Sequence, residues 1–443
     1  MIGTAVALLS ALIAGLIIVS AVDPDVGKRI VAGEGFLFGI ALPSAVLFVL
    51  SISGIRWTLP ILTIASLAMV SVAFMRRKPG RVREMRQTRS WLATFVDLLT
   101  LLVIAGYATF ATNGPVIEYD FIGIWGVKGW TFFLHQGIDW NFLESPWRTF
   151  THTDYPLLLP LTFDYLAVVR GAWDDRWIGL LYAAYGAAAL LVARGALEEE
   201  SGNASYSALG TFALASAALS PYIGLAEGPM IAYGGVGIIL IRRAILRSSR
   251  AGITAGAVML GLAASSKNEG LTLVVAAIVG AVVAIGMDRK LLRLWPAVII
   301  PAPWMLLRTL HSLHNDLATG NVAIRVWQHL HEPALFLESI TRYPLGRPLF
   351  WLGLLILFVA LLPRALKRER FALTTIALQY LFYLFAYLST PHGVDWHFKW
   401  SWERVITQMT FPLAFTVLVA AIPVLFPSRD GSVKNGEDLL PAK

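Results

Sequence analysis

The chain has 443 residues, of which 57% are hydrophobic and only 14% charged, and its mean hydropathy is +0.66. About a quarter of the residues of an ordinary soluble domain are charged, so this composition excludes a soluble globular protein. Cysteine is absent, which excludes disulfides, thiolate metal sites and cysteine nucleophiles.

The apolar residues occur in runs of roughly 16 to 22, the length that a helix needs to cross a hydrocarbon layer about 30 Å thick. We therefore expect an all-α polytopic membrane protein with about 13 transmembrane helices. The predicted spans are about 4–22, 35–53, 57–75, 91–111, 177–193, 205–220, 222–241, 252–266, 270–287, 294–308, 349–363, 371–388 and 405–426. No basic region precedes the first run and another apolar run follows it, so we interpret it as a retained helix rather than a secretory signal.

Four clusters of basic residues separate these runs and indicate the topology. They are Arg76, Arg77, Lys78, Arg81, Arg83 and Arg86; Arg242, Arg243, Arg247 and Arg250; Arg289, Lys290 and Arg293; and Arg364, Lys367, Arg368 and Arg370. Such clusters are typical of cytoplasmic loops, and this pattern accounts for the net charge of +8 better than binding to nucleic acid does.

With those clusters in the cytoplasm, a second set of loops becomes extracytoplasmic on an inner or plasma membrane. These loops are 112–155, about 221–228, 267–270, 309–347 and 389–403. Residues 156–170 break the alternation of sides, so we expect them to lie in the outer leaflet without crossing it.

The chain divides into three regions. Residues 1–90 hold three N-terminal accessory spans and a basic cytoplasmic linker, 91–427 form a larger transmembrane region, and 428–443 are a polar tail that we expect to be disordered in the cytoplasm. No internal repeat is evident, which disfavours an inverted-repeat transporter.

An acidic pair, Glu118 and Asp120, follows the fourth span. Charged and aromatic residues then recur at helical spacing, which predicts an amphipathic juxtamembrane helix with Trp125, Trp130 and Phe133 at headgroup depth. The acidic pair either faces the lipid headgroups or merely caps and solvates the end of the helix.

Further along the same loop, Pro156 disfavours the α conformation at Tyr155, and Pro160 discourages a regular helix start. We therefore expect His152 and Asp154 to lie on an extended stretch at the membrane surface. That placement suits a fixed polar site better than a flexible linker.

Charged residues also occur at three later external positions. Glu227 is either a functional carboxylate near membrane depth or part of a solvated turn, and Lys267 and Glu269 either bind a ligand or pair with each other. Arg404 lies at the predicted start of the last span. Its planar guanidinium can bind two phosphate oxygens at once.

Aromatic and charged residues alternate in segment 391–402, where Trp396, His397 and Lys399 lie. Tryptophans of this kind either form an interfacial belt or stack on a sugar ring. His311, His314 and Asp316 have a spacing that allows metal ligation, but they lack a convincing further ligand, and His329 and His331 point to opposite faces of an extended segment.

Three sequence features together resemble GT-C fold glycosyltransferases over residues 91–427. They are the acidic pair after a span, the aromatic amphipathic segment, and the entry His152-Thr153-Asp154-Tyr155-Pro156. The segments Gly224–Pro229, Ser266–Leu271 and Ser401–Arg404 fit the same resemblance. This superfamily includes protein O-mannosyltransferases and aminoarabinose transferases. Many of its members carry Asp where this chain has Glu227, and a Lys-Pro-Pro element that is absent here.

The resemblance implies an enzyme that moves a sugar from a polyprenyl phosphate-type donor to a lipid, glycan or protein acceptor outside the membrane. It implies that Asp120 is the base, with Glu118 as its substitute. The implied substrate contacts are Lys128, His152, Asp154, Tyr155, Glu227, Lys267, Glu269, Trp396, His397, Lys399 and Arg404. No metal-ligand set is evident, and because the similar enzymes differ in metal use, a divalent metal cofactor stays open. The alternatives are a transporter or lipid flippase, and a surface-polysaccharide polymerase or ligase of different fold.

Overall fold

The computed structural model describes residues 1–22, 26–75, 90–313, 320–342 and 348–426. Within these ranges the regular structure is entirely helical, with no strand, so the all-α class is confirmed. The basic linker from Arg76 to Arg86, His314, Asp316 and the tail 428–443 lie outside the described residues.

Among the described residues, seven helical segments are long and apolar enough to cross a membrane, or up to eight if one bent pair counts as a span. The seven are Ile2–Ala21, Lys28–Ile52, Trp91–Ala111, Asp175–Ser201, Glu227–Leu246, Arg370–Leu388 and Val394–Leu425; the bent pair, Arg289–Ile299 with Ala302–Leu310, turns by 44°. Three shorter apolar helices occupy other predicted spans, Leu59–Met75, Arg250–Ala264 and Glu269–Ile285. The polytopic arrangement agrees with the sequence, and the number of about 13 spans stays a prediction.

The larger helices follow the apolar runs closely. They are α1 (Ile2–Val22), α2 (Lys28–Ile52), α3 (Leu59–Met75), α4 (Trp91–Ala111), α8 (Ile178–Ser201), α9 (Ala204–Ala218), α11 (Gly235–Leu246), α12 (Arg250–Ala264), α13 (Glu269–Ile285), α18 (Pro348–Arg368), α19 (Arg370–Leu388) and α20 (Val394–Leu425). Several begin at a local signal: the side chains of Ser90, Asn203 and Ser249 accept hydrogen bonds from the first turns of α4, α9 and α12.

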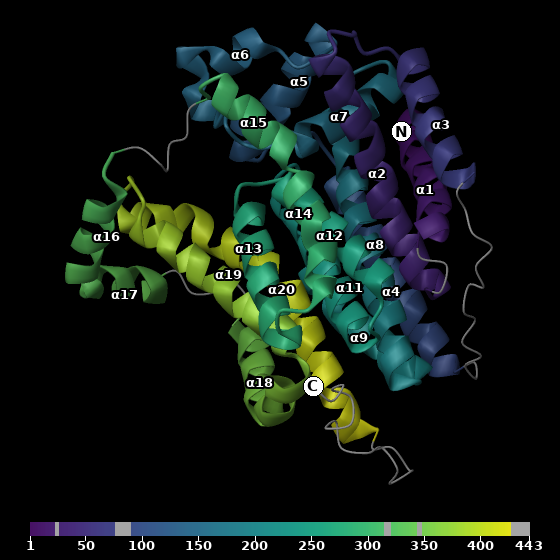
Figure 1. Ribbon diagram of the computed structural model, residues 1–443, viewed down its shortest axis with the longest axis vertical. Coiled ribbons are helices and arrows are strands. Elements are labelled where there is room, and N and C mark those ends of the chain that lie inside the picture. Colours follow the sequence, from purple (N-terminus) through teal and green to yellow (C-terminus); the bar gives the residue numbers. More distant parts are fainter. Residues whose placement is uncertain (23–25, 76–89, 314–319, 343–347, 427–443) are drawn as a thin grey trace.

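Short helices fill the connections. They are η1 (Phe121–Trp125), α5 (Gly126–His135), α6 (Trp140–Glu144), η2 (Pro146–Thr151), α7 (Leu158–Arg170), η3 (Asp175–Trp177), α10 (Glu227–Pro229), η4 (Met230–Gly234), η5 (Arg289–Leu294), α14 (Trp295–Ile299), α15 (Ala302–Leu310), α16 (Val322–His331) and α17 (Pro333–Arg342). Figure 1 shows α5, α6 and α15 at one end of the bundle and α18 at the other. We call these the loop end and the basic end.

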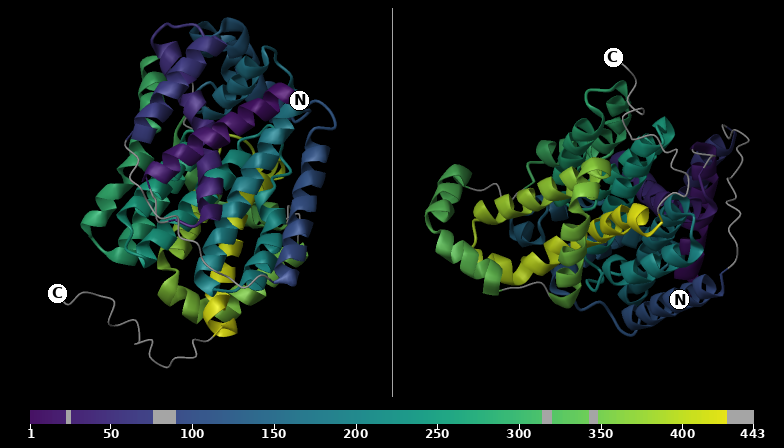
Figure 2. Two further views of the ribbon diagram at one scale, coloured as in Figure 1. Left: turned by 90° about the vertical axis from the view of Figure 1, so that its right-hand side faces the viewer. Right: turned by 90° about the horizontal axis from the view of Figure 1, so that it is seen from below.

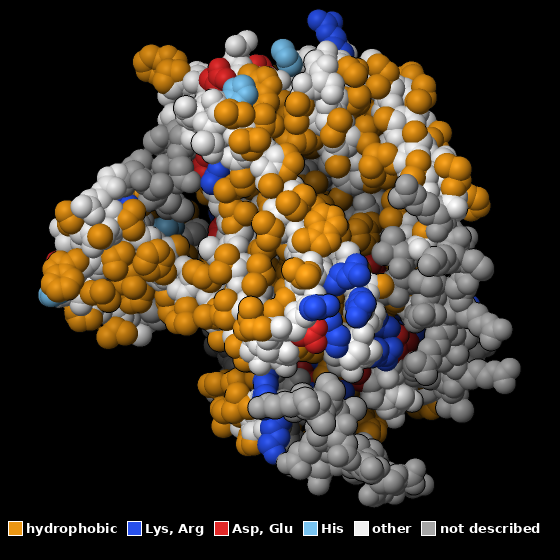
Figure 3. Space-filling model, viewed as in Figure 1, with side chains coloured by type: hydrophobic (Ala, Val, Ile, Leu, Met, Phe, Trp, Pro, Cys, Tyr) orange, Lys and Arg blue, Asp and Glu red, His pale blue; other side chains and the backbone are white. Residues whose placement is uncertain are grey.

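The distribution of charge distinguishes the two ends. Figure 3 shows hydrophobic side chains over most of one face, with Lys and Arg gathered towards the basic end. In Figure 2 the N-terminal helices lie on one flank of the bundle, while α16 and α17 stand apart on the opposite flank. Figure 3 also shows a hollow between the α16–α17 pair and the rest of the bundle.

Helix α7 occupies the segment that broke the alternation of sides. It has 13 residues, fewer than the roughly 20 that a span requires, in agreement with the expectation that it does not cross. Its residues from Leu158 to Ala167 are buried rather than interfacial, because α1, α2 and α5 pack around it. Ser44 of α2 and Thr162 bond through their hydroxyls at 3.0 Å, and Tyr165 donates to the carbonyl of Ala7. The N-terminal helices thus share one core with the rest of the chain.

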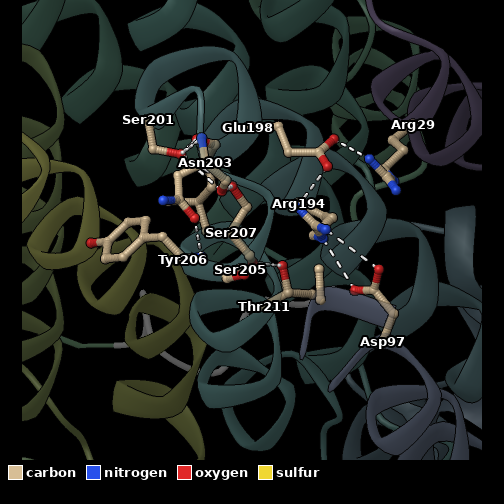
Figure 4. Close-up of polar contacts among 12 residues, drawn as sticks. Arg29, Asp97, Arg194, Glu198, Ser201, Asn203, Ser205, Tyr206, Ser207 and Thr211 are labelled. Atoms are coloured by element: carbon tan, nitrogen blue, oxygen red, sulfur yellow. Dashed lines mark hydrogen bonds and ion pairs between the residues drawn. The ribbon is translucent and has the colours of Figure 1, made fainter. Parts of the chain in front are cut away.

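Ion pairs tie the helices together at the basic end, where α8 ends in Glu198–Glu200. Glu198 pairs with Arg29 of α2 and, at 2.8 Å, with Arg194 one turn earlier, and Arg194 reaches Asp97 of α4 at 3.2 Å (Figure 4). Three helices that are distant in sequence therefore meet in one charged cluster.

Arg242 continues this cluster towards the C-terminal helices. Its buried guanidinium pairs with both Glu200 and Glu369, and Arg368 of α18 reaches Glu200 at 2.9 Å. Burying a charge is costly unless it is paired, and here the pairing joins α8, α11, α18 and the start of α19.

Candidate functional site

Asp120 lies immediately before the π-helical turn η1, which continues directly into α5. The predicted amphipathic helix therefore exists, with one correction. Trp125 is buried against Tyr155, with ring centroids 5.4 Å apart, and does not face outward, while Trp130 remains exposed; the depth of both residues in a membrane stays a prediction. The wide π turn changes the helical phase and turns Trp125 inward.

Glu227 opens the broken helix formed by α10, η4 and α11. Its carboxylate is buried, and Gly228 beside it allows the ring of Tyr182 to pack there, since a Cβ at this glycine would lie 2.5 Å from a ring carbon. The Tyr182 hydroxyl donates to the carbonyl of Leu225. The turn before Glu227 is thereby held by packing and by a hydrogen bond.

Lys267 and Glu269 flank Asn268 in the tight turn between α12 and α13. Gly270 makes this turn possible, because a Cβ there would lie 2.4 Å from the carbonyl oxygen of Ala263. The prediction that a helix opens at this segment is confirmed, because α13 begins at Glu269.

Arg404 was expected to open the last helix, and this expectation is wrong. Helix α20 begins at Val394, so Arg404 lies well inside a continuous helix of 32 residues. The aromatic residues before Arg404 pack along α19, as the stacked rings of Tyr387 and Phe398 show, and this packing extends the helix beyond the apolar run.

These segments bring five charged residues into one chain of contacts, the ion chain. Arg404 Nη2 contacts Asp120 Oδ2 at 2.5 Å and Arg404 Nε contacts Glu227 Oε1 at 3.3 Å. Lys267 Nζ contacts the same Glu227 oxygen at 3.0 Å and Glu269 Oε1 at 2.7 Å. Lys267 thus pairs with Glu269, and it also bonds the buried Glu227, while its contact with a ligand stays a prediction.

The ion chain contains two cations and three carboxylates, so its formal charge is −1. Burial lowers the pKa of the Lys267 amine, but the carboxylates of Glu227 and Glu269 outweigh that effect and raise the pKa above its ordinary value. Lys267 is therefore a cation at neutral pH. Among the described residues, Glu227 Oε2 has no hydrogen-bond partner although it is buried, an arrangement that is costly in a purely structural ion pair.

A second polar group adjoins the ion chain through Asn268. Its amide donates to Asp154 Oδ2 at 3.0 Å, and its carbonyl oxygen accepts from Arg308 Nη1 at 3.3 Å. Trp304 of α15 donates to the backbone carbonyl of Asp154 at 3.1 Å. The segment between α4 and α7 that contains Asp154 is thus bound to the α12–α13 turn and to α15.

His152 and Asp154 do not lie on an extended stretch, which corrects the expectation from Pro156. The 3-10 helix η2 ends at Thr151, the next residue His152 has a left-handed φ of +50°, and Asp154 follows in a turn. Pro160 is tolerated because it lies in the first turn of α7, where backbone N–H groups have no partner within the helix.

Lys128 is fully buried behind this turn. Its amine donates to the carbonyl of His152 at 2.6 Å and lies 5.7 Å from the ring centroids of both Trp125 and Tyr155. Burial lowers the pKa of Lys128 to about 7, although the nearby carboxylate of Asp154 acts in the opposite direction. Lys128 therefore exists in both charged and neutral forms near neutral pH.

The remaining predicted residues lie apart from the ion chain. Glu118, Trp396 and Lys399 are exposed, and Lys399 lies over the ring of Trp400. His397 shares a helix face with Arg404 about 10 Å further along α20, and its Nδ1 is 2.8 Å from the Thr390 hydroxyl.

No metal centre is evident in the described ranges, where no group of three or more acidic or histidine ligands comes together. His311 instead stacks on Trp140, with ring centroids 3.9 Å apart, and its Nδ1 contacts Glu144 at 2.5 Å. His329 Nδ1 lies 2.7 Å from the carbonyl oxygen of Leu388.

Sequence reasoning missed three polar residues at the site. Besides Asn268 and Arg308, Gln379 of α19 donates to the backbone carbonyl of Glu269 at 3.1 Å. A glutamine in the middle of an apolar run is itself a signal, because a polar group there needs a partner. The signal at Asn268 was its place between Lys267 and Glu269.

Known proteins give no independent guide to the identity of this site. No family model, curated protein or solved structure matches the chain. The function must therefore be inferred from the residues and their geometry.

Proposed function

We propose that this protein is a membrane glycosyltransferase that moves a sugar from a polyprenyl phosphate-type donor to an acceptor at the extracytoplasmic face. The observation that carries the proposal is the ion chain itself. Asp120, Glu227, Lys267 with Glu269, and Arg404 come from four separate segments and meet at the loop end. Two cations contact the buried Glu227 carboxylate, and its second oxygen has no hydrogen-bond partner among the described residues, which supports a functional site here.

The chemistry of sugar transfer needs a base and cations near each other. Asp120 would accept the proton of the acceptor hydroxyl, while Arg404 and Lys267 would stabilise the phosphate that leaves. Glu227 binds both cations and so fixes their separation. A guanidinium and an ammonium held by one carboxylate can face a single phosphate group.

The transporter alternative is less well supported by the positions of the charges. The ion pairs of the described helices concentrate in two clusters, one at the loop end and one around Glu198–Glu200 at the basic end. A transport path would place paired charges midway along the spans, and of the ion chain only Arg404 lies well inside a candidate span. A surface-polysaccharide polymerase or ligase stays a competing proposal.

A transfer assay with purified protein tests the proposal. Protein in lipid nanodiscs would be incubated with a panel of radiolabelled polyprenyl phosphate sugars and with total membrane lipid as acceptor. We expect the sugar to move into a new product and polyprenyl phosphate to be released, and we expect the Asp120→Asn variant to give neither. Absence of release from every donor in the panel, with protein that binds them, would remove the transferase proposal.

A further inference from the structure

The ion chain has a charge balance that bears on how an anion could bind there. Arg404 is already engaged by Asp120 and Glu227, and Lys267 by Glu227 and Glu269. Both cations are thus neutralised, and the formal charge of the group is −1. A phosphate would be repelled by this arrangement unless it took the place of one carboxylate.

The three carboxylates differ in how readily they could be displaced. Glu227 is 1% exposed and bridges two cations, so releasing it would leave a buried charge unpaired. Asp120 is 22% exposed and lies next to the exposed residues Glu118 and Tyr119. Water can solvate the Asp120 carboxylate once it is released, so its ion pair is the one that exchanges at low cost.

Glu269 is also partly exposed, at 26%, but its place differs from that of Asp120. It contacts Lys267 at the first turn of α13, and its backbone carbonyl accepts from Gln379. The Glu269 segment is thereby held on α19. Asp120, by contrast, lies in the helical turn just before η1, directly after the irregular segment 115–118.

We propose that Asp120 and the donor phosphate compete for Nη2 of Arg404, so that binding of the donor releases the base. This inference rests on the proposed function and adds an order of events to it. Arg404 keeps its Nε contact with Glu227 and remains in place while Nη2 changes partner. The resting ion pair therefore keeps Asp120 engaged until a phosphate arrives.

The transfer step balances with these groups. The acceptor hydroxyl oxygen forms a bond to the anomeric carbon as its proton passes to the released Asp120 carboxylate. The bond between that carbon and the phosphate oxygen breaks, and its electron pair stays on the phosphate. A phosphodiester donor of charge −1 thus yields a phosphate monoester of charge −2, whose extra charge Arg404 and Lys267 stabilise.

Competition predicts an effect that a purely structural ion pair does not. Replacing Asp120 with Asn removes the competitor, so the variant should bind a polyprenyl phosphate more tightly than the parent while losing turnover. We expect the dissociation constant to fall about 5-fold to 10-fold, where 10-fold corresponds to about 1.4 kcal/mol. Glu118→Gln removes a neighbouring acidic charge that does not contact Arg404, and it should change the affinity much less.

The experiment measures equilibrium binding of undecaprenyl monophosphate, and of uncharged undecaprenol, to full-length protein in neutral-lipid nanodiscs. The single variants are Asp120→Asn, Glu118→Gln and Arg404→Gln. A double variant combines Asp120→Asn with Arg404→Gln. The gain from Asp120→Asn should vanish in the double variant and should not occur with undecaprenol. If Arg404→Gln does not fold, Arg404→Met takes its place in the cycle, because it also lacks a cation for which phosphate and Asp120 could compete.

The outcomes separate this inference from the proposed function. Unchanged or weaker binding by Asp120→Asn, or an equal gain from Glu118→Gln, would overturn the competition even if sugar transfer is observed. If Asp120→Asn alone binds undecaprenyl monophosphate more tightly, but the protein transfers no sugar, the competition would be supported and the transferase proposal would be removed. Equal binding of phosphate and alcohol by the parent and by Arg404→Gln would exclude a phosphate site here.

Discussion

Arg404 and Asp120 are 284 residues apart in the chain, yet the guanidinium of one contacts the carboxylate of the other at 2.5 Å. Under the proposed function, this contact joins the group that binds phosphate to the group that accepts a proton. The same guanidinium reaches the buried Glu227, so one arginine connects a partly exposed and a buried carboxylate.

The first prediction concerns the base. Asp120→Asn keeps the shape of the side chain but removes its proton affinity, so turnover should fall about 100-fold to 10,000-fold, the usual contribution of a general base. Initial rates of transfer at saturating donor would measure this fall. Glu118→Gln is the matched control, and a larger loss from that variant would assign the base role to Glu118.

The second prediction compares two carboxylates that bind the same amine. Glu227→Gln should lower the free energy of unfolding by about 2 to 3 kcal/mol. This is less than the cost of leaving a buried charge with no partner, because Arg404 keeps Asp120 and Lys267 keeps Glu269. Glu269→Gln should cost about 1 kcal/mol or less, since the Glu269 side chain is partly exposed. Unfolding midpoints in detergent would measure both, and equal losses would contradict the assigned difference in burial.

The third prediction is a pH dependence at Lys128. Its pKa falls from an ordinary value near 10.5 in the unfolded chain to about 7 in the folded protein, so the unfolded chain binds more protons between these values. The contribution of Lys128 to stability therefore rises as the pH increases from 7 towards 10.5 and is constant below 7.

The variant Lys128→Met has no such titration, so it serves as the reference. Its advantage in unfolding temperature over the parent should be largest at pH 7 and below, and should shrink by pH 9. An advantage that is independent of pH would show that Lys128 stays charged when folded. Lys399→Met, at an exposed position on the same protein, should show no comparable trend.

The fourth prediction concerns the basic end. Arg242 is 2% exposed and pairs with both Glu200 and Glu369, so Arg242→Met should cost about 3 kcal/mol by leaving the buried Glu369 carboxylate poorly paired. Arg247→Met removes a 33% exposed arginine from the same helix end and should cost about 1 kcal/mol or less. Thermal unfolding of both variants measures the difference. If Arg247→Met lowers the free energy of unfolding as much as Arg242→Met does, the cluster acts through its net charge alone.

The fifth prediction fixes the sides of the membrane. Because the natural chain lacks cysteine, single cysteines can be placed at the exposed Thr149 of the loop end and at the exposed Met287 of the basic end. In intact cells an impermeant thiol reagent should label Thr149→Cys, and it should label Met287→Cys only after permeabilisation. The reverse pattern would place the ion chain in the cytoplasm and would contradict an extracytoplasmic site.

The lengths of the apolar runs determined the helical class and most helix positions, because helix formation across a membrane depends on local sequence. The sequence also separated the two sets of loops: segments predicted to be external meet in the ion chain, and Arg242 and Arg368 meet around Glu200 at the other end. It could not place Trp125 inside, nor extend the last helix back to Val394, because both depend on packing against residues distant in the chain.

Only the tertiary structure decided which charged residues meet. Asp120, Glu227, Lys267 and Arg404 are each predicted at the same side, but their contacts depend on how every helix is rotated and how closely neighbouring helices pack. Gly270 illustrates the reason, since its missing side chain lets α13 start against Ala263 and sets the position of Lys267. Hydrophobic length is a local property of the sequence, whereas helix rotation follows from the fit of many side chains at once.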